Sequence, residues 1–153
     1  MTPEETREVV TRFYDALTRR DGETMAACYA ENATFDDPAF SLRGADCGKM
    51  WIGLMRRAKD FSAQYTIAKA GSGTATVEWT ARYLFGGKNP VTNVILSELV
   101  LENGRIVKQV DTFDFPRWAG QALGLPGKLF ARFAWFQAKV RKKAAAGLGL
   151  PSR

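Results

Sequence analysis

The amino-acid sequence predicts an α+β fold in which helices pack on one face of a curved antiparallel sheet. Apolar residues recur at helical spacing in the first third of the chain, and from about residue 61 they alternate with polar residues. An Asn103-Gly104 pair, typical of a tight hairpin, separates the last two alternating segments. Helical segments followed by a run of strands are characteristic of α+β domains.

The predicted helices are three. Thr2 is the expected N-cap of the first, with Pro3 at the first helical position and Glu5 in the capping-box place. A short second helix is expected near Glu23–Tyr29. Asp46 can cap a third helix, whose apolar stripe has i, i+3, i+4 spacing and comprises Cys47, Met50, Trp51, Leu54, Met55 and Ala58.

A brief strand is expected at Ala33–Asp36, ended by the pair Asp37-Pro38. Four further strands, expected near residues 61–67, 74–85, 91–101 and 105–115, would form a meander. The segment 91–101 is apolar on both faces, which predicts cover on both, the second by another subunit. A bent sheet closed by helices leaves a conical cavity, and concave apolar spaces are usual ligand sites.

The charge divides the chain into two parts. Of 22 Lys and Arg and 16 Asp and Glu, residues 1–115 carry 14 basic and all 16 acidic side chains, and the remainder carries eight basic side chains and no acid. We therefore expect a domain at residues 1–117 and a basic, amphipathic, helical extension at 118–153. Its helix, within residues 127–143, is expected to carry one apolar stripe, formed by Leu129, Phe130, Phe133, Phe136 and Val140. This helix either packs over the domain or its dimer mate, or rests on an anionic membrane surface, for which Trp135 is suited. Nucleic-acid binding is disfavoured because the body lacks a basic face.

The absence of histidine excludes Ser-His-Asp and Cys-His catalysis and the usual zinc and non-haem iron sites. No glycine-rich phosphate loop precedes a helix, so we expect neither cofactor nor metal. The N-terminus is charged and no apolar run reaches membrane-spanning length. Two cysteines, Cys28 and Cys47, are interpreted as packing residues in a reducing, cytoplasmic setting.

Three stretches, Val10–Tyr14, Ala30–Pro38 and Asn103–Val107, make the chain resemble the nuclear transport factor 2-like superfamily. That superfamily includes ketosteroid isomerases, SnoaL-like polyketide cyclases and limonene epoxide hydrolases. The resemblance implies a cone-shaped curved antiparallel sheet with three N-terminal helices enclosing a cavity. It also implies a homodimer packed through the outer sheet face.

The resemblance also implies site residues. Asp37 stands where the proton-shuttling Asp of ketosteroid isomerases lies. The oxyanion-holding Tyr of that family would fall on Phe13, next to Tyr14, and its second oxyanion donor, a protonated Asp, would fall on Ser97. The epoxide hydrolase acid matches Asp111, but the Arg-x-Asp pair of that family would fall on Trp79-Thr80-Ala81, which carries neither group. The SnoaL-like cyclase pattern asks only for an inward acid on the last strand, and Asp111 fits it.

These observations favour a cofactor-free isomerase or cyclase acting on an apolar carbonyl compound. Asp37 would be the general base, and either a protonated Asp111 or Tyr14 would stabilise the enolate oxygen. The expected pocket residues are Trp51, Trp79, Ser97 and Phe113. Each residue also has a structural alternative: Asp37 as a turn residue, Asp111 paired with a buried donor, and Tyr14 as a core residue. The alternative for the whole protein is a binding module without chemistry.

Overall fold

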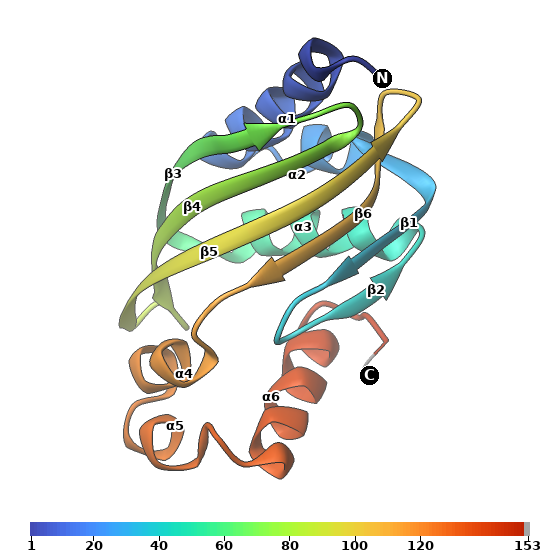
Figure 1. Ribbon diagram of the computed structural model, residues 1–153. Helices are drawn as coiled ribbons and strands as arrows, with labels where there is room; N and C mark the ends of the chain where they lie inside the picture. The colour runs from blue at the N-terminus through green and yellow to red at the C-terminus, as the bar shows by residue number, and fades with distance from the viewer. Residues whose placement is uncertain (152–153) are drawn as a thin grey trace.

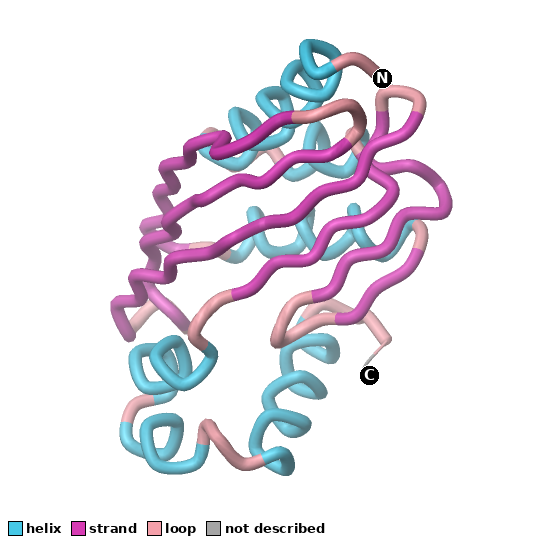
Figure 2. Tube along the Cα trace, in the orientation of Figure 1, coloured by secondary structure: helices cyan, strands magenta, loops and turns pink. Residues whose placement is uncertain are grey.

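The computed structural model describes residues 1–151, which form an α+β fold built on one curved sheet (Figures 1 and 2). Three N-terminal helices lie behind the sheet, and they are α1 (Pro3–Thr18), α2 (Gly22–Ala27) and α3 (Ala45–Arg57). The strands are β1 (Tyr29–Asp36), β2 (Ser41–Arg43), β3 (Lys59–Ala70), β4 (Thr74–Phe85), β5 (Asn89–Glu102) and β6 (Arg105–Thr112). Three C-terminal helices follow below the sheet, namely α4 (Phe115–Leu123), α5 (Leu125–Phe130) and α6 (Ala134–Gly147).

The sheet has the order β2-β1-β6-β5-β4-β3. The predicted meander is confirmed, since β3 to β6 pair in sequence and antiparallel. The sheet is mixed rather than wholly antiparallel, because β1 pairs with β6 in parallel. This pairing needs the long connection through the rest of the sheet, which local alternation does not reveal.

Of the three local signals for caps and turns, two are confirmed and one is wrong. Thr2 and Glu5 form the predicted capping box of α1. Asp46 is not the cap of α3: the N-cap is Gly44, with φ of 63°, and Asp46 lies in the first turn, where its charge favours the helix N-terminus. The 103–104 turn is confirmed, with positive φ at both Asn103 and Gly104.

Several element bounds differ from the prediction. β1 starts at Tyr29, which was expected in the second helix, and β2 was not predicted because three residues are too few to show a period. The last strand ends at Thr112, not at Phe115. Asp114 caps α4 by accepting a hydrogen bond from the main-chain N–H of Arg117 at 3.0 Å.

The main core lies between the sheet and α1–α3. Its largest fully buried side chains include Phe13, Tyr14, Phe35 and Leu17. Cys28 and Cys47 are buried free thiols, as expected. Register irregularities in β3, next to Lys59 and to Ile67, accompany the bend that wraps the sheet around these helices.

The C-terminal helices lie at the lower end of the sheet (Figure 1). The boundary expected between residues 117 and 118 falls inside α4, and the predicted single helix within residues 127–143 is broken at residues 131–133. α4 is tied to the sheet by a hydrogen bond from the Trp118 indole to the Tyr83 hydroxyl at 2.8 Å. After α6, Leu148 lies against Gly53 of α3, and Ala145 and Leu150 are buried in the main core. The segment therefore folds back onto the body at both of its ends.

Candidate functional site

The expected acid Asp111 lies in the interior of the cone on β6. Its side chain is 3% exposed, and it stands directly opposite Ser97 of β5 in the sheet register. Burial raises the pKa of Asp111 to about 6, although the side chains of Ser97 and Gln109 act to lower it. Asp111 is therefore a buried carboxyl group that changes its protonation state near neutral pH.

A chain of hydrogen bonds crosses the interior and ends on Asp111. The indole N–H of Trp51 donates to the hydroxyl of Tyr29 at 2.8 Å, and this hydroxyl donates to Oε1 of Gln109 at 2.6 Å. The amide of Gln109 then donates from Nε2 to Oδ1 of Asp111 at 3.0 Å. The chain fixes the orientation of the Gln109 amide and presents its N–H to the carboxyl group.

The other expected acid, Asp37, lies in the turn between β1 and β2. Its Oδ1 accepts hydrogen bonds from the main-chain N–H groups of Ala39 and Phe40, at 2.7 and 2.6 Å. Burial, followed by the charge of Asp111, raises the pKa of Asp37 to about 7, while these N–H groups and the charge of Arg141 act to lower it. The turn role weighed for Asp37 is therefore present, and the same side chain is electrostatically coupled to Asp111.

The hydroxyl of Tyr14 is buried and has no hydrogen-bond partner within residues 1–151. Burial and then the charge of Asp111 raise the pKa of Tyr14 well above its usual value, while the nearby Ser97 side chain acts to lower it, so the hydroxyl stays protonated. Although Tyr14 is rotated by about 100° from Phe13 around α1, both side chains are fully buried. A buried hydroxyl without a partner is costly, and it is the kind of group that a ligand oxygen can satisfy.

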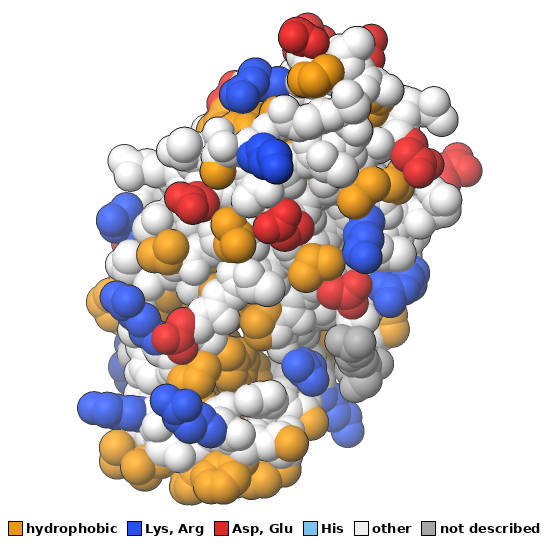
Figure 3. Space-filling model, viewed as in Figure 1, with side chains coloured by type: hydrophobic (Ala, Val, Ile, Leu, Met, Phe, Trp, Pro, Cys, Tyr) orange, Lys and Arg blue, Asp and Glu red, His pale blue; other side chains and the backbone are white. Residues whose placement is uncertain are grey.

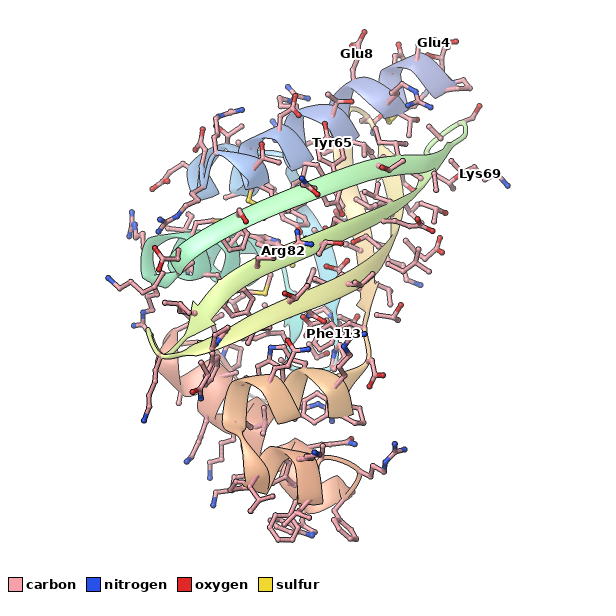
Figure 4. All side chains as sticks on the ribbon, turned by 90° about the vertical axis from the view of Figure 1, so that its left-hand side faces the viewer. Glu4, Glu8, Tyr65, Lys69, Arg82 and Phe113 are labelled. Atoms are coloured by element: carbon pink, nitrogen blue, oxygen red, sulfur yellow. The ribbon has the colours of Figure 1, made fainter. Side chains whose placement is uncertain are left out.

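The expected pocket residues surround these groups. Trp51 and Trp79 are buried with their ring centroids 6.2 Å apart, and the indole N–H of Trp79 donates to the hydroxyl of Ser97 at 2.9 Å. The single N–H donor of each indole is thus already used, and the rings present apolar surface to the interior. Phe113 lies between the end of the sheet and α4 (Figure 4) and packs against both hydrophobic cores.

The lower end of the sheet faces the C-terminal helices (Figure 1). The space-filling view is hollowed between the sheet and the C-terminal helices, with hydrophobic side chains in the depth of the hollow (Figure 3). α6 reaches this end through Arg141, whose Nε donates to the main-chain oxygen of Pro38 at 2.7 Å. The residues around the Asp37 turn therefore come from both the body and the C-terminal segment.

Sequence reasoning missed Tyr29, Arg141 and the bonding role of Gln109. The parity of β6 places Gln109 on the same face as Asp111, two residues away, so a signal was present for it. Nothing in the sequence pattern pointed to Tyr29, since it was assigned to a helix end, or to Arg141, which lies 104 residues from Asp37. In the described part of the chain, no group of three or more carboxylate or thiol side chains lies together as a metal site would require.

The fold is that of small α+β cone proteins, the nuclear transport factor 2-like superfamily, and comparisons with known proteins agree. A family model described as SnoaL-like domain matches residues 10–109, and the chain belongs to this family. No curated protein matches the sequence. No helix of the described residues is long and apolar enough to cross a membrane.

Solved structures share the fold at low sequence identity. One is a hypothetical protein with a ketosteroid isomerase-like fold from Catenulispora acidiphila in complex with trimethylamine, with a TM-score of 0.68, 19% identity, and coverage of 80% of this chain and 97% of that chain. A provisionally named polyketide cyclase from Silicibacter has a TM-score of 0.68 at 16% identity, covering 79% and 97%. An LEH-like epoxide hydrolase from M. tuberculosis has a TM-score of 0.62 at 21% identity, covering 85% and 98%.

Proposed function

We propose that this protein is a cofactor-free isomerase or cyclase that moves a proton on an apolar carbonyl compound. The observation that carries the proposal is the coupled pair Asp37 and Asp111, whose pKa values are raised to about 7 and about 6. A carboxyl group is an effective proton acceptor or donor when its pKa lies near the working pH. Family membership supports the proposal, because SnoaL-like and related folds are hosts of such chemistry.

The two carboxyl groups titrate as a pair, since the charge of one raises the pKa of the other. Between about pH 6 and pH 7 the pair therefore holds close to one proton. The higher pKa of Asp37 places this proton mainly on Asp37. The proposed reaction uses the less populated form, in which the carboxylate of Asp37 is the base and Asp111 holds the proton and can donate a hydrogen bond. Oδ1 of Asp37 is held by two main-chain N–H groups, which leaves Oδ2 to accept a proton.

In the proposed reaction, the carboxylate of Asp37 removes a proton from the carbon next to the substrate carbonyl. The electron pair of the broken C–H bond forms the enolate, whose oxygen accepts a hydrogen bond from Tyr14 or from protonated Asp111. An isomerase would return the proton to a different carbon. A cyclase would let the enolate carbon attack a second carbonyl of the same molecule, and the proton would pass to the new alkoxide.

The substrate is expected to be apolar because most of the side chains expected to line the pocket are apolar. Trp51 and Trp79 have donated their N–H groups within the protein, so they meet a ligand through ring faces. Phe113 adds a further apolar surface at the end of the sheet. Ser97, opposite Asp111, is the polar exception and accepts from Trp79.

The test is exchange of the α-hydrogens of 2-tetralone, an apolar enolisable ketone, in D2O, followed by proton NMR. Asp37→Asn and Asp111→Asn are each expected to slow enzyme-dependent exchange by about 10²-fold or more. Asp36→Asn is the matched control, because this neighbouring acid is bonded to Ser41 and paired with Arg43, away from the interior. Exchange undiminished in both Asp37→Asn and Asp111→Asn would rule out the mechanism.

The alternative is a binding module that holds an apolar ligand without chemistry. The unpartnered Tyr14 hydroxyl is compatible with either role, since it would bond a ligand oxygen in both. Saturable 2-tetralone binding, measured by quenching of tryptophan fluorescence, with no exchange above the buffer rate would favour the binding module.

We further propose a homodimer through the outer face of the sheet. Val94, which is 61% exposed, lies with Leu96 and Val100 on this face of β5. A hollow of about 370 Å³ on the same face is lined by Thr76, Glu98, Val100, Lys108 and others. Val94→Glu together with Val100→Glu is expected to convert a dimer to a monomer in analytical ultracentrifugation. The buried free thiols are in keeping with the cytoplasm as the expected compartment.

A further inference from the structure

The turn between α5 and α6 exposes a cluster of large apolar side chains. Trp135 is 58% exposed, Phe133 is 52% exposed and Leu125 is 66% exposed. The set, which we name the aromatic tip, comprises Leu125, Leu129, Phe130, Phe133 and Trp135. In Figure 3 hydrophobic side chains gather at the lower end of the molecule, over α5 and the start of α6. An exposed apolar cluster of this kind is unusual on a soluble domain and marks an interaction surface.

The break in the helix is what turns these side chains outward. A continuous helix within residues 127–143 would place Phe130, Phe133 and Phe136 on one stripe, as their spacing predicts. Instead Phe136 is buried with Phe115 and Ala131 in a small core between the C-terminal helices. The tip residues are not buried in that core, although the rings of Phe130 and Trp135 lie against Phe136, with centroids 6.3 and 5.8 Å from it.

The aromatic tip is preassembled. The rings of Phe133 and Trp135 are stacked with centroids 6.3 Å apart and an interplanar angle of 21°. The Phe130 ring lies 5.6 Å from that of Trp135. Docking would therefore require little ordering of these side chains, which lowers its entropic cost.

The tip is surrounded by positive charge. Lys128 of α5, Arg132 of the turn and Lys139 of α6 are exposed, and α6 continues with exposed Lys142 and Lys143. From residue 115 to the end of the chain there is no Asp or Glu. A surface that matches this charge pattern is anionic around an apolar interior, which is the composition of a bilayer with acidic headgroups.

We propose that the aromatic tip docks the protein on the surface of an anionic lipid bilayer. The tip residues would enter the interface between headgroups and acyl chains, where tryptophan and phenylalanine are favoured, and the flanking lysines and arginines would contact acidic headgroups. The docking is independent of the proposed chemistry at Asp37 and Asp111. It would turn the end of the molecule that carries α4–α6 toward the membrane (Figure 1).

A second copy of this chain and a nucleic acid fit the aromatic tip less well than a bilayer does. Two copies meeting through the tip would bring two positive rims together, which opposes self-association. A nucleic acid would match the cations, but Leu125 and Leu129 supply aliphatic surface that phosphates and sugars do not use.

The experiment is flotation of the full chain with two kinds of vesicle. One contains phosphatidylcholine alone and is neutral, and the other contains about 30% phosphatidylserine, which makes its surface negative. We expect binding to the acidic vesicles at least about tenfold tighter than to the neutral ones, and weakened by salt. Lys128→Glu with Arg132→Glu should reduce this binding about tenfold or more. The matched control is Arg7→Glu with Lys49→Glu, two exposed basic residues on α1 and α3, and should bind as the wild type does.

Phe133→Ser with Trp135→Ser should abolish vesicle binding while leaving the circular dichroism and melting temperature unchanged, because both side chains are exposed. Brominated phospholipids should quench the fluorescence of Trp135 in the wild type. The proposal would be overturned by equal flotation of the wild type and this double variant, or by flotation with neither vesicle. It would also be overturned if the double variant lost only a concentration-dependent dimer or only the binding of a single-stranded oligonucleotide.

Discussion

Arg141 donates a hydrogen bond from Nε to the main-chain oxygen of Pro38 at 2.7 Å, and so holds the last helix against the turn that carries Asp37. The guanidinium charge lowers the pKa of Asp37, against the larger effects of burial and of Asp111. The C-terminal segment thus contributes to the electrostatics of a site whose acids belong to the body of the domain.

Replacing Arg141 with Met is expected to raise the pKa of Asp37 above about 7, because the nearby positive charge is lost. In the exchange assay, the rise of rate with pH should then move to higher pH. Arg141→Lys keeps the charge and loses the Nε hydrogen bond, and should shift the profile less. A carbon-13 NMR titration of labelled aspartate measures the pKa directly, and an unchanged value in Arg141→Met would contradict this role.

Stability should fall as the pH rises from about 4 to about 7, owing to the buried acid Asp111. In the unfolded chain its pKa is about 3.9, whereas in the folded protein it is raised to about 6. The folded state therefore holds a proton that the unfolded state has released, so its stabilising effect is lost as the pH rises through the folded pKa. Asp111→Asn removes this loss, and relative to the variant the wild type should lose roughly 2–3 kcal/mol between pH 4 and pH 8.

Urea denaturation at both pH values measures this difference. Asp36→Asn serves as the control and should follow the wild type. In Asp111→Asn the pKa of Asp37 should also fall, because the charge of Asp111 contributes to raising it. The same slope of stability with pH in the wild type and Asp111→Asn would show that Asp111 has no raised pKa.

Two buried tyrosines provide a matched pair of hydroxyl deletions. Tyr14→Phe removes a hydroxyl that has no partner in the described chain, so stability should stay equal or rise by up to about 1 kcal/mol. Tyr29→Phe removes a hydroxyl that accepts from Trp51 and donates to Gln109, and should cost about 1–3 kcal/mol. Thermal unfolding of both variants measures these changes.

In the exchange assay, Tyr14→Phe is expected to lose activity although it keeps its stability. Tyr14→Phe is expected to lower kcat by about 10-fold to 10³-fold if its hydroxyl stabilises the enolate oxygen. A stable Tyr14→Phe variant with full activity would assign Tyr14 to packing alone.

Two glycines test how α5 is seated against α4. A Cβ on Gly127 would lie 2.1 Å from the main-chain oxygen of Ala119, so Gly127→Ala must push the two helices apart. We expect a cost of about 1–3 kcal/mol and faster hydrogen exchange of amides in α4 and α5. Gly120→Ala is the control, since its Cβ would meet Lys128 at an ordinary 3.8 Å. Equal exchange in the two variants would show that this close approach does not hold the helices together.

The sequence alone determined the element types and the family. Local signals suffice for these: the capping box at Thr2, the stripe around Trp51, the period of two in the strands and the turn at Asn103. The inward orientation of Asp111 also followed from strand parity. These features depend on neighbours in the chain, so the pattern of residues contains them.

Tertiary structure decided what the side chains meet. The coupling of Asp37 to Asp111, the unpartnered hydroxyl of Tyr14 and the contact of Arg141 with the Pro38 turn all join residues far apart in the chain. The break at residues 131–133 likewise follows from the burial of Phe136, and it converts a predicted stripe into an exposed tip. Burial and distance set both the pKa values and the exposed surface, and neither quantity exists before the chain has folded.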